Sequence, residues 1–262
     1  MNKDQTDHAP NFSLDLNGEI ALVTGATSGL GRRFALILAS CGAKVAITGR
    51  RVERLTELAN EIRAAGGECE PVAMDMTDRE QIRAGLKQVE SALGTVTILV
   101  NNAGIPDAQR ATRIDDALFD RVMDTNLEGP WFLSCAIAAQ LMKEKRRGNI
   151  VNIASIAAFS TQPNVAAALY STTKAALVRM TEALAVEWAA FNINVNAIAP
   201  GTFASEMVDG MIGRIGDFSG AFPRKRICDP SQLDSTLLFL VSPSSDAVTG
   251  TCIKVDDGQV GR

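Results

Sequence analysis

Tyr170 is the only tyrosine in the chain, and Lys174 follows it four residues later. On a helix this spacing puts the two side chains on one face. A free phenol has a pKa of about 10 and is a poor base at neutral pH, but a neighbouring ammonium group stabilises the phenolate and lowers that pKa. The pair could therefore exchange a proton with a substrate oxygen. A core tyrosine beside a lysine whose amine reaches solvent is the alternative.

A second candidate site is a glycine-rich turn. The apolar run Ile20 to Thr24 leads into Gly25, Gly29 and Gly31, and apolar residues then recur with helical spacing. Gly25 permits a sharp turn, Gly29 lets the main chain approach a ligand, and Gly31 lets the helix pack close to the strand. The unpaired amides and the dipole of that helix favour an anion such as a pyrophosphate. A tight loop without a ligand is the alternative.

The end of the second apolar run bears on which nucleotide would bind. About 20 residues after the glycine turn, dinucleotide-binding domains carry the group that reads the adenosine ribose. Gly49 stands there in place of an acid, and the Arg50 guanidinium could hold a 2′-phosphate. We therefore expect NADP, with NAD as the alternative that leaves Arg50 exposed to solvent. Arg51 is included in the predicted site, although it could equally be an exposed helix charge.

Two later strand ends supply further candidates. Asp75 could accept a hydrogen bond from an adenine amino group, or it could cap the helix that begins near Asp78. At Asn102, Ala103 and Gly104, small residues let the main chain run beside a flat ring, while the asparagine side chain ties neighbouring strand ends together. A simple turn at the end of a strand is the alternative for these three residues.

Apolar runs alternate with helical patterns along the whole chain. This order predicts an α/β fold, a single doubly wound (Rossmann) domain of about seven parallel strands with helices on both faces. The expected strands are Ile20–Thr24, Lys44–Thr48, Glu70–Met74, Thr97–Asn101, Asn149–Ala154, Asn194–Ile198 and Cys252–Val255. The expected helices are Gly29–Ser40, Arg51–Ala65, Asp78–Ala92, an extended one within Asp116–Lys145, Ala168–Ala190 and Pro230–Val241.

Composition narrows the range of functions. The formal net charge is −4 and basic residues are scattered, which argues against nucleic acid as a partner. No apolar run is long enough to span a bilayer, and no secretory signal is found. The five cysteines are widely spaced, so we expect reduced thiols in a cytoplasmic protein and no metal site. The only histidine, His8, falls in residues 1–13, which are predicted to be a flexible leader before the domain at 14–262.

Four motifs occur in order: Thr24-Gly25-xxx-Gly29-x-Gly31, Asn101-Asn102-Ala103-Gly104, Tyr170-xxx-Lys174 and Pro200-Gly201. From about Leu14 to the C-terminus, the chain resembles the short-chain dehydrogenase/reductase family. The resemblance implies hydride transfer between a nicotinamide and a ketone or secondary alcohol, with a tyrosine that protonates the carbonyl oxygen in reduction. It also implies a serine that polarises this oxygen and a helical asparagine that holds a water beside the lysine. The predicted catalytic residues are Asn126, Ser155, Tyr170 and Lys174.

One interval departs from the family pattern. Ser155 and Tyr170 are separated by about two residues more than is usual. We expect Ser155 to reach the site, whereas Ser160 or Thr161 would replace it if the added residues prevented this.

The resemblance also places Ser205 where a threonine commonly contacts the nicotinamide carboxamide, although capping of a helix is a competing role. The complete predicted cofactor site comprises Gly25, Thr27, Ser28, Gly29, Leu30, Gly31, Arg50, Arg51, Asp75, Met76, Asn102, Ala103, Gly104, Tyr170, Lys174, Pro200, Gly201, Phe203 and Ser205.

The expected function is that of an NADP-dependent ketoreductase or alcohol dehydrogenase acting on a hydrophobic carbonyl compound. Residues 203–226 are rich in glycine and are predicted to form a mobile lid. Basic residues in this lid raise the alternative of a 3-oxoacyl thioester reductase. A non-catalytic NADP-binding regulatory or scaffold protein is the alternative of another class, supported only by the altered Ser155 interval. Apolar residues on more than one face of the helices near 131–142 and 177–191 indicate a homodimer or homotetramer.

Overall fold

Strands of the described chain form one parallel sheet in the order β3-β2-β1-β4-β5-β6-β7. The computed structural model describes residues 11–161 and 166–260, so His8 and most of the predicted leader lie outside the described residues. The strands are β1 Ile20–Thr24, β2 Lys44–Gly49, β3 Cys69–Ala73, β4 Ile98–Asn101, β5 Gly148–Ile153, β6 Ile193–Pro200 and β7 Cys252–Val255. The predicted α/β doubly wound fold and its seven strands are confirmed.

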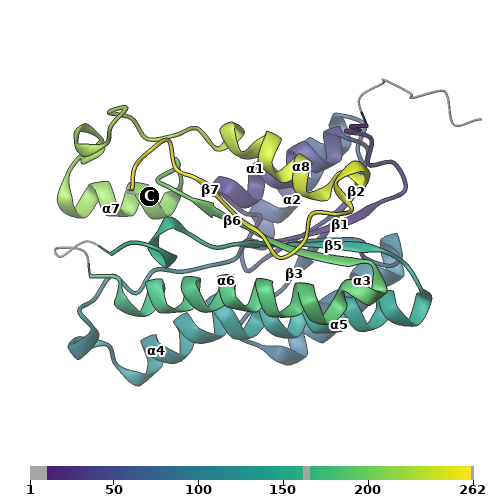
Figure 1. Cartoon of the computed structure of the whole chain (residues 1–262), viewed down its shortest axis with the longest axis horizontal. Helices are drawn as coiled ribbons and strands as arrows, with labels where there is room; N and C mark the ends of the chain where they lie inside the picture. Colours follow the sequence, from purple (N-terminus) through teal and green to yellow (C-terminus); the bar gives the residue numbers. More distant parts are fainter. Residues whose placement is uncertain (1–10, 162–165, 261–262) are drawn as a thin grey trace, which may run out of the picture.

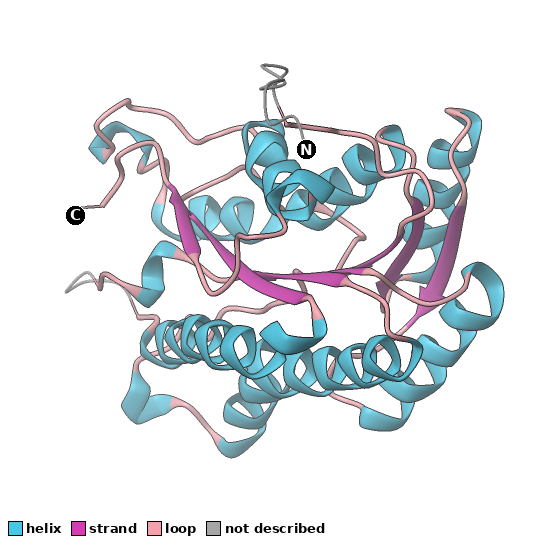
Figure 2. Cartoon of the chain, turned by 45° about the vertical axis from the view of Figure 1, so that its right-hand side comes forward, coloured by secondary structure: helices cyan, strands magenta, loops and turns pink. Residues whose placement is uncertain are grey.

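Helices cover both faces of the sheet (Figures 1 and 2). On one face lie α1 Gly29–Ser40, α2 Val52–Ala64 and α8 Asp234–Val241. On the other face lie α3 Arg79–Leu93, α4 Asp116–Met123, α5 Gly129–Glu144 and α6 Ala168–Trp188. Each layer buries its own aliphatic core against the sheet, one around Phe34 and Leu38 of α1, the other around Leu133 and Leu177.

The strand order places a crevice at the carboxyl ends of two central strands, β1 and β4. β1 pairs with both β2 and β4, so the chain builds outward through β2 and β3 and then returns to the other side of β1. Loops that follow β1 and β4 therefore diverge at the carboxyl ends of these strands, where doubly wound sheets bind ligands. The glycine turn after Thr24 and the loop after Asn101 both lie at this point.

The elements differ from the predicted ones in two places. The long helix expected within Asp116–Lys145 is divided by a π-helical turn, Asp124–Glu128. The region predicted to be an irregular lid contains a regular helix, α7 Glu206–Ile215. Gly210 and Gly213 lie inside this helix and weakened its sequence signal, because glycine is a poor helix former.

Other expectations concern metals, thiols and membranes. All five cysteines are free, as expected for reduced thiols. No group of three or more potential metal-ligating side chains occurs among the described residues. Within residues 11–161 and 166–260, no helix has both the length and the apolar character needed to cross a bilayer.

Candidate active site

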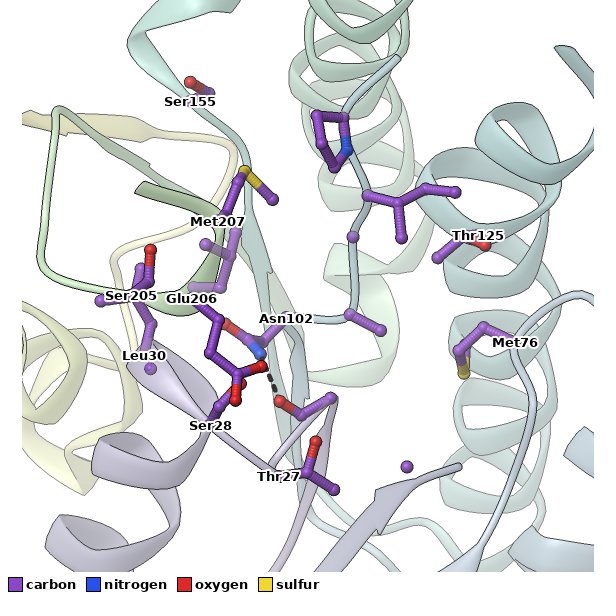
Figure 3. A pocket seen from close by; sticks show the side chains of 18 of the residues that line it. Thr27, Ser28, Leu30, Met76, Asn102, Thr125, Ser155, Ser205, Glu206 and Met207 are labelled. Atoms are coloured by element: carbon purple, nitrogen blue, oxygen red, sulfur yellow. Dashed lines mark hydrogen bonds between the residues drawn. The ribbon is translucent and has the colours of Figure 1, made fainter. Parts of the chain in front are cut away.

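A cleft of about 540 Å³ opens at the carboxyl ends of the strands. Ser155 lies at one end and Thr27 and Ser28 at the other, with Glu206 between them (Figure 3). The cleft is lined by every residue of the predicted cofactor site except Gly31. Among the predicted catalytic residues, Ser155, Tyr170 and Lys174 line it as well, whereas Asn126 lies behind its wall.

The glycine turn is shaped by its contacts with the loop after β4. A Cβ at Gly25 would come within 2.8 Å of the Ala103 Cα, and Gly25 has a φ of +66°. A Cβ at Gly31 would come within 2.4 Å of both the Gly25 oxygen and the Asn102 Nδ2. Gly31 therefore allows the close packing of helix and strand that the sequence predicts, and it does not line the cleft.

Asn102 fastens the two loops to each other. Its Nδ2 donates to the main-chain oxygens of Thr24 and Gly25, at 2.9 and 3.2 Å. Its main-chain N–H, like that of Ala103, donates to the Thr24 hydroxyl. The Asn102 side chain thus holds the glycine turn and the loop after β4 together at the wall of the cleft.

The N-terminus of α1 is left without a side-chain cap. Its N-cap residue, Ser28, makes no side-chain hydrogen bond to the helix, whereas Asp78 caps α3 through the N–H groups of Glu80 and Gln81. The first amides of a helix need acceptors, and the helix dipole favours a negative charge there. The turn at Ser28 and Gly29, which line the cleft, therefore suits the pyrophosphate of a dinucleotide.

Arg51, more than Arg50, faces the glycine turn. The Arg51 guanidinium donates to the Thr27 hydroxyl at 2.6 Å and to the Ser28 hydroxyl at 3.1 Å. Arg50 is more exposed and lies 3.9 Å from the Asp75 carboxylate. Both arginines line the cleft. Of the two arginines, Arg51 is therefore the one held against the glycine turn.

Gly49 is closely enclosed by the same turn. A Cβ at this position would lie 2.8 Å from the Thr27 Cγ2. An acidic side chain here, which would accept from the free ribose hydroxyls of NAD, would therefore require the Thr27 side chain to move.

Glu206, the first residue of α7, crosses the cleft to the arginines. Its carboxylate pairs with Arg51 at 2.8 Å and also with Arg54. Hydrogen bonds from these two side chains, that from Arg54 foremost, lower the pKa of Glu206. We call Arg50, Arg51, Arg54 and Glu206 the basic end of the cleft. Glu206 was missed by sequence reasoning, because nothing in its local sequence shows which side chains the lid helix faces.

Tyr170 and Lys174 lie at the opposite end, on consecutive turns of α6. The Lys174 Nζ lies 5.6 Å from the centre of the Tyr170 ring and donates to the Ile153 oxygen at 2.7 Å. Burial lowers the pKa of Lys174 to about 8. A Cβ at Gly104 would lie 3.3 Å from this Nζ, so a small residue there leaves room for the lysine.

The ionisation of Tyr170 differs from the expected one. Burial raises the pKa of Tyr170, and the negative charge of Asp107 raises it further, while a hydrogen bond with Ser155 lowers it. Burial thus opposes the lowering of this pKa by Lys174 that the sequence predicts. The phenol is a proton donor at neutral pH.

Ser155 remains next to Tyr170 despite the longer interval between them. It follows β5, and its hydroxyl accepts from the Ala157 N–H at 3.1 Å and also hydrogen-bonds Tyr170. Ser160 and Thr161 do not line the cleft. Part of the interval, residues 162–165, lies outside the described residues.

Asn126 is fully buried in the π-helical turn. Its Oδ1 accepts from the Ile105 N–H at 2.8 Å, and its Nδ2 donates to the Ile105 oxygen at 2.9 Å and the Thr173 hydroxyl at 3.2 Å. The π turn is the local distortion that presents this side chain to both neighbours. Asn126 thus ties α6 to the loop that lines the cleft, and the water-holding role implied by the resemblance stays a prediction.

Two alternative roles are decided by hydrogen bonds. Asp78, and not Asp75, caps α3. Asp75 accepts instead from the N–H and hydroxyl of Thr77 and lines the cleft. Ser205 is the N-cap of α7 and accepts from the Val208 N–H at 3.4 Å, so its capping role is present. Ser205 lines the cleft as well, which leaves the predicted contact with a carboxamide open to it.

Comparison with known proteins agrees with this geometry. A family model described as short chain dehydrogenase matches residues 19–212. The chain is 34% identical over 253 residues to a 2-dehydro-3-deoxy-D-gluconate 5-dehydrogenase from Dickeya dadantii, covering 95% of this chain and 98% of that protein. It is 32% identical over 246 residues to a 3-oxoacyl-acyl-carrier-protein reductase from Thermotoga maritima, covering 94% and 99%.

Solved structures give the same picture. A short-chain type dehydrogenase/reductase from Mycobacterium marinum superposes with a TM-score of 0.91 at 34% identity, covering 95% of this chain and 98% of that one. A gluconate 5-dehydrogenase from Burkholderia cenocepacia, in complex with NADP and tartrate, gives a TM-score of 0.88 at 29% identity over 95% and 98% of the two chains.

Proposed function

We propose that this chain, which belongs to the short-chain dehydrogenase/reductase family, is an NADP-dependent oxidoreductase. It would interconvert a ketone and a secondary alcohol. The strongest support is the meeting of Ser155, Tyr170 and Lys174 at one end of a single cleft that has an uncapped helix terminus and a basic cluster at the other.

The preference for NADP rests on the basic end of the cleft. Arg51 is held on the hydroxyls of Thr27 and Ser28, where its guanidinium could bind a 2′-phosphate. Thr27 fills the space that an acidic residue at Gly49 would need. The related gluconate 5-dehydrogenase structure contains NADP, which agrees with this preference.

The chemistry assigned to the chain's own residues follows from their contacts. When bound, the nicotinamide would supply or accept the hydride at the substrate carbon. Ser155 would donate a hydrogen bond to the carbonyl oxygen and so favour negative charge on it. Tyr170, whose raised pKa keeps it protonated at neutral pH, would give its proton to that oxygen in reduction. Lys174 would stabilise the phenolate left behind, because its ammonium group lies on the same wall.

The substrate would be a carbonyl compound with apolar groups beside the reacting carbon. Apolar residues line the cleft, among them Ile105, Pro106, Phe203 and Met207. Two of the lid cations that suggested a 3-oxoacyl thioester are paired within the chain, since both Arg224 and Arg226 contact the Asp257 carboxylate. Relatives are named for sugar-acid oxidation and for acyl-thioester reduction, so both classes belong in a substrate panel.

A second copy of the chain would cover an apolar groove on the far side of α5 and α6. This groove, of about 480 Å³, is lined by Trp131, Met123, Leu127 and Met180, with Glu128 and Arg179 at its rim. The Trp131 side chain is exposed in the single chain, as expected for a residue that a second copy would bury. We therefore propose a homodimer or homotetramer. We also propose a cytoplasmic location.

Oxidation of NADPH and NADH should be measured with a panel of apolar ketones, keto sugar acids and 3-oxoacyl thioesters. We expect turnover with NADPH, and a fall of about 10³-fold in kcat for Tyr170→Phe, because general acid catalysis contributes about 10²- to 10⁴-fold. NADPH should still stabilise Tyr170→Phe against thermal unfolding. Binding of NADPH without turnover of any substrate would instead favour the non-catalytic alternative.

A further inference from the structure

Asp107 is a buried carboxylate that the proposed reaction does not use. It lies between β4 and α4, and only 3% of its surface is exposed. Its Oδ2 accepts hydrogen bonds from the main-chain N–H groups of Leu169 at 2.9 Å and Tyr170 at 3.3 Å. An acid from a distant loop thus binds the amide of the predicted proton donor itself.

We propose that Asp107 is a positioning residue for Tyr170: it caps the start of α6 and thereby fixes the predicted proton donor in the cleft. This inference rests on the proposed function, since it concerns the same site. Nothing in the sequence around Asp107 indicates it, because the helix that it caps begins about 60 residues later.

The need for a distant cap is visible in α6. Its N-cap residue is Ala167, which has no polar side chain to offer, and no side-chain cap is found there. By contrast, α4 is capped locally by Asp115 and α7 by Ser205. The first N–H groups of a helix need acceptors, and a carboxylate also interacts favourably with the helix dipole. For α6, Asp107 supplies both.

The loop that carries Asp107 is itself held in place. The Asp107 Oδ1 accepts from the Ala108 N–H at 2.7 Å, and Ala108 has a φ of +50°, in the left-handed region that costs a non-glycine residue energy. Two residues earlier, the main chain of Ile105 is bound on both sides by Asn126. The segment 104–108 therefore connects the asparagine, the wall of the cleft and the start of α6.

The placement has an electrostatic consequence. The groups that face Tyr170 are the Ser155 hydroxyl, the Lys174 ammonium and the Asp107 carboxylate. Burial is the main cause of the raised pKa of Tyr170, and the negative charge of Asp107 at the start of the helix adds to it, because a nearby anion opposes formation of the phenolate. It would keep the tyrosine protonated until the substrate oxygen takes the proton. An uncharged cap would have no such effect.

The test uses the fact that Tyr170 is the only tyrosine in the chain. Tyrosinate absorbance, with Tyr170→Phe as the blank, reports its ionisation in the whole protein without any turnover. Asp107→Asn keeps an acceptor for α6 and removes the charge. The midpoint of its tyrosinate titration should therefore lie at lower pH than that of the wild type. The matched control is Asp115→Asn, which alters the local cap of α4 and should leave the midpoint unchanged.

Kinetics test the positioning itself. Asp107→Ala removes the acceptor and should lower kcat about 10- to 100-fold with KM for NADPH within about two-fold, since small misplacements of a reacting group cost this much. Asp107→Asn should restore most of kcat. Equal midpoints for Asp107→Asn and the wild type, or an unchanged kcat in Asp107→Ala, would overturn the inference. Absence of turnover by the wild type would contradict the proposed function, while the titration would still decide the role of Asp107.

Discussion

The two ends of the cleft are held by different kinds of interaction. At the catalytic end, Lys174 is 3% exposed and Asn126 is fully buried, and each binds main-chain groups of elements far away in the sequence. At the basic end, the side chains of Arg51 and Glu206 are 41% and 47% exposed and form ion pairs. Buried hydrogen bonds are costly to leave unmade, whereas exposed ion pairs contribute little and can be exchanged.

This difference suits different tasks. A proton donor must stand within a fraction of an ångström of its place, so its surroundings are packed and satisfied. A nucleotide must enter and leave, so the groups that meet it need partners that a phosphate can replace. Glu206 is such a partner, because it is a carboxylate on two arginines that could hold a phosphate instead.

After that of Tyr170→Phe, the largest effect is expected at Lys174. Lys174→Met should lower kcat by at least about 100-fold, because the phenolate loses its cation. The same variant should be more stable than the wild type at pH 7. Burial lowers the pKa of Lys174 from its ordinary value of 10.5 to about 8, so folding pays for a buried ammonium group below pH 8.

The pH dependence has a definite sign. Between about pH 8 and 10.5 the unfolded chain holds a proton at Lys174 that the folded chain has lost, so wild-type stability rises with pH relative to Lys174→Met. At pH 7 the free energy of unfolding of Lys174→Met should exceed that of the wild type by up to about 3 kcal/mol. Loss of the hydrogen bond to Ile153 reduces this gain by about 1 kcal/mol. Urea unfolding at pH 7 and pH 10 measures it. The exposed Lys143→Met is the control, and a Lys174→Met variant less stable than the wild type at both pH values would contradict this account.

The sequence predicts the catalytic end better than the basic end. Long aliphatic runs fix the strands, and their bounds agree with the structure to within two residues. Tyr170 and Lys174 share a helix, so their spacing alone brings them together. By contrast, the choice between Arg50 and Arg51 depends on where α2 begins and how each side chain turns, which no local pattern specifies.

Contacts between distant segments explain the remaining misses. The lid helix α7 contains two glycines, so its sequence predicts a loop. In the structure, Ser205 caps this helix. Asp107 and Glu206 each act on a residue more than 60 positions away. Such contacts form only in the packed fold, and the spacing of apolar residues along the sequence does not indicate them.

The next largest effect is expected at Arg51. Arg51→Ala should raise the dissociation constant of NADPH about 10- to 100-fold, because a charge-assisted hydrogen bond to a phosphate contributes about 1.5 to 3 kcal/mol. The affinity for NADH should change less than about three-fold. Titration calorimetry with both nucleotides measures these constants.

Arg50→Ala is the matched control for Arg51→Ala, since the two residues are adjacent in the chain and both line the cleft. We expect it to weaken NADPH binding by less than about three-fold, because Arg50 is more exposed and lies 3.9 Å from Asp75. A larger loss for Arg50→Ala than for Arg51→Ala would return the 2′-phosphate to the residue that the sequence first indicated.

The smallest effect, and the one that tests the comparison most directly, is expected at Glu206. Its carboxylate occupies Arg51 and Arg54, so a 2′-phosphate must displace or share it. Glu206→Gln should therefore tighten NADPH binding about two- to five-fold, the equivalent of an exposed ion pair of about 0.5 to 1 kcal/mol. NADH carries no phosphate there, and its affinity should not change.

The gain in Glu206→Gln should shrink as salt is added, because exposed charges are screened within about 8 Å at physiological ionic strength. Asp209→Asn, on the exposed face of the same helix α7, is the control for a general loss of negative charge and should leave both affinities unchanged. If Glu206→Gln instead weakened both nucleotides equally, the carboxylate would be a support of the lid and not a competitor for the arginines. The basic end would then be as fixed as the catalytic one, and the contrast between exchangeable and fixed ends would fail.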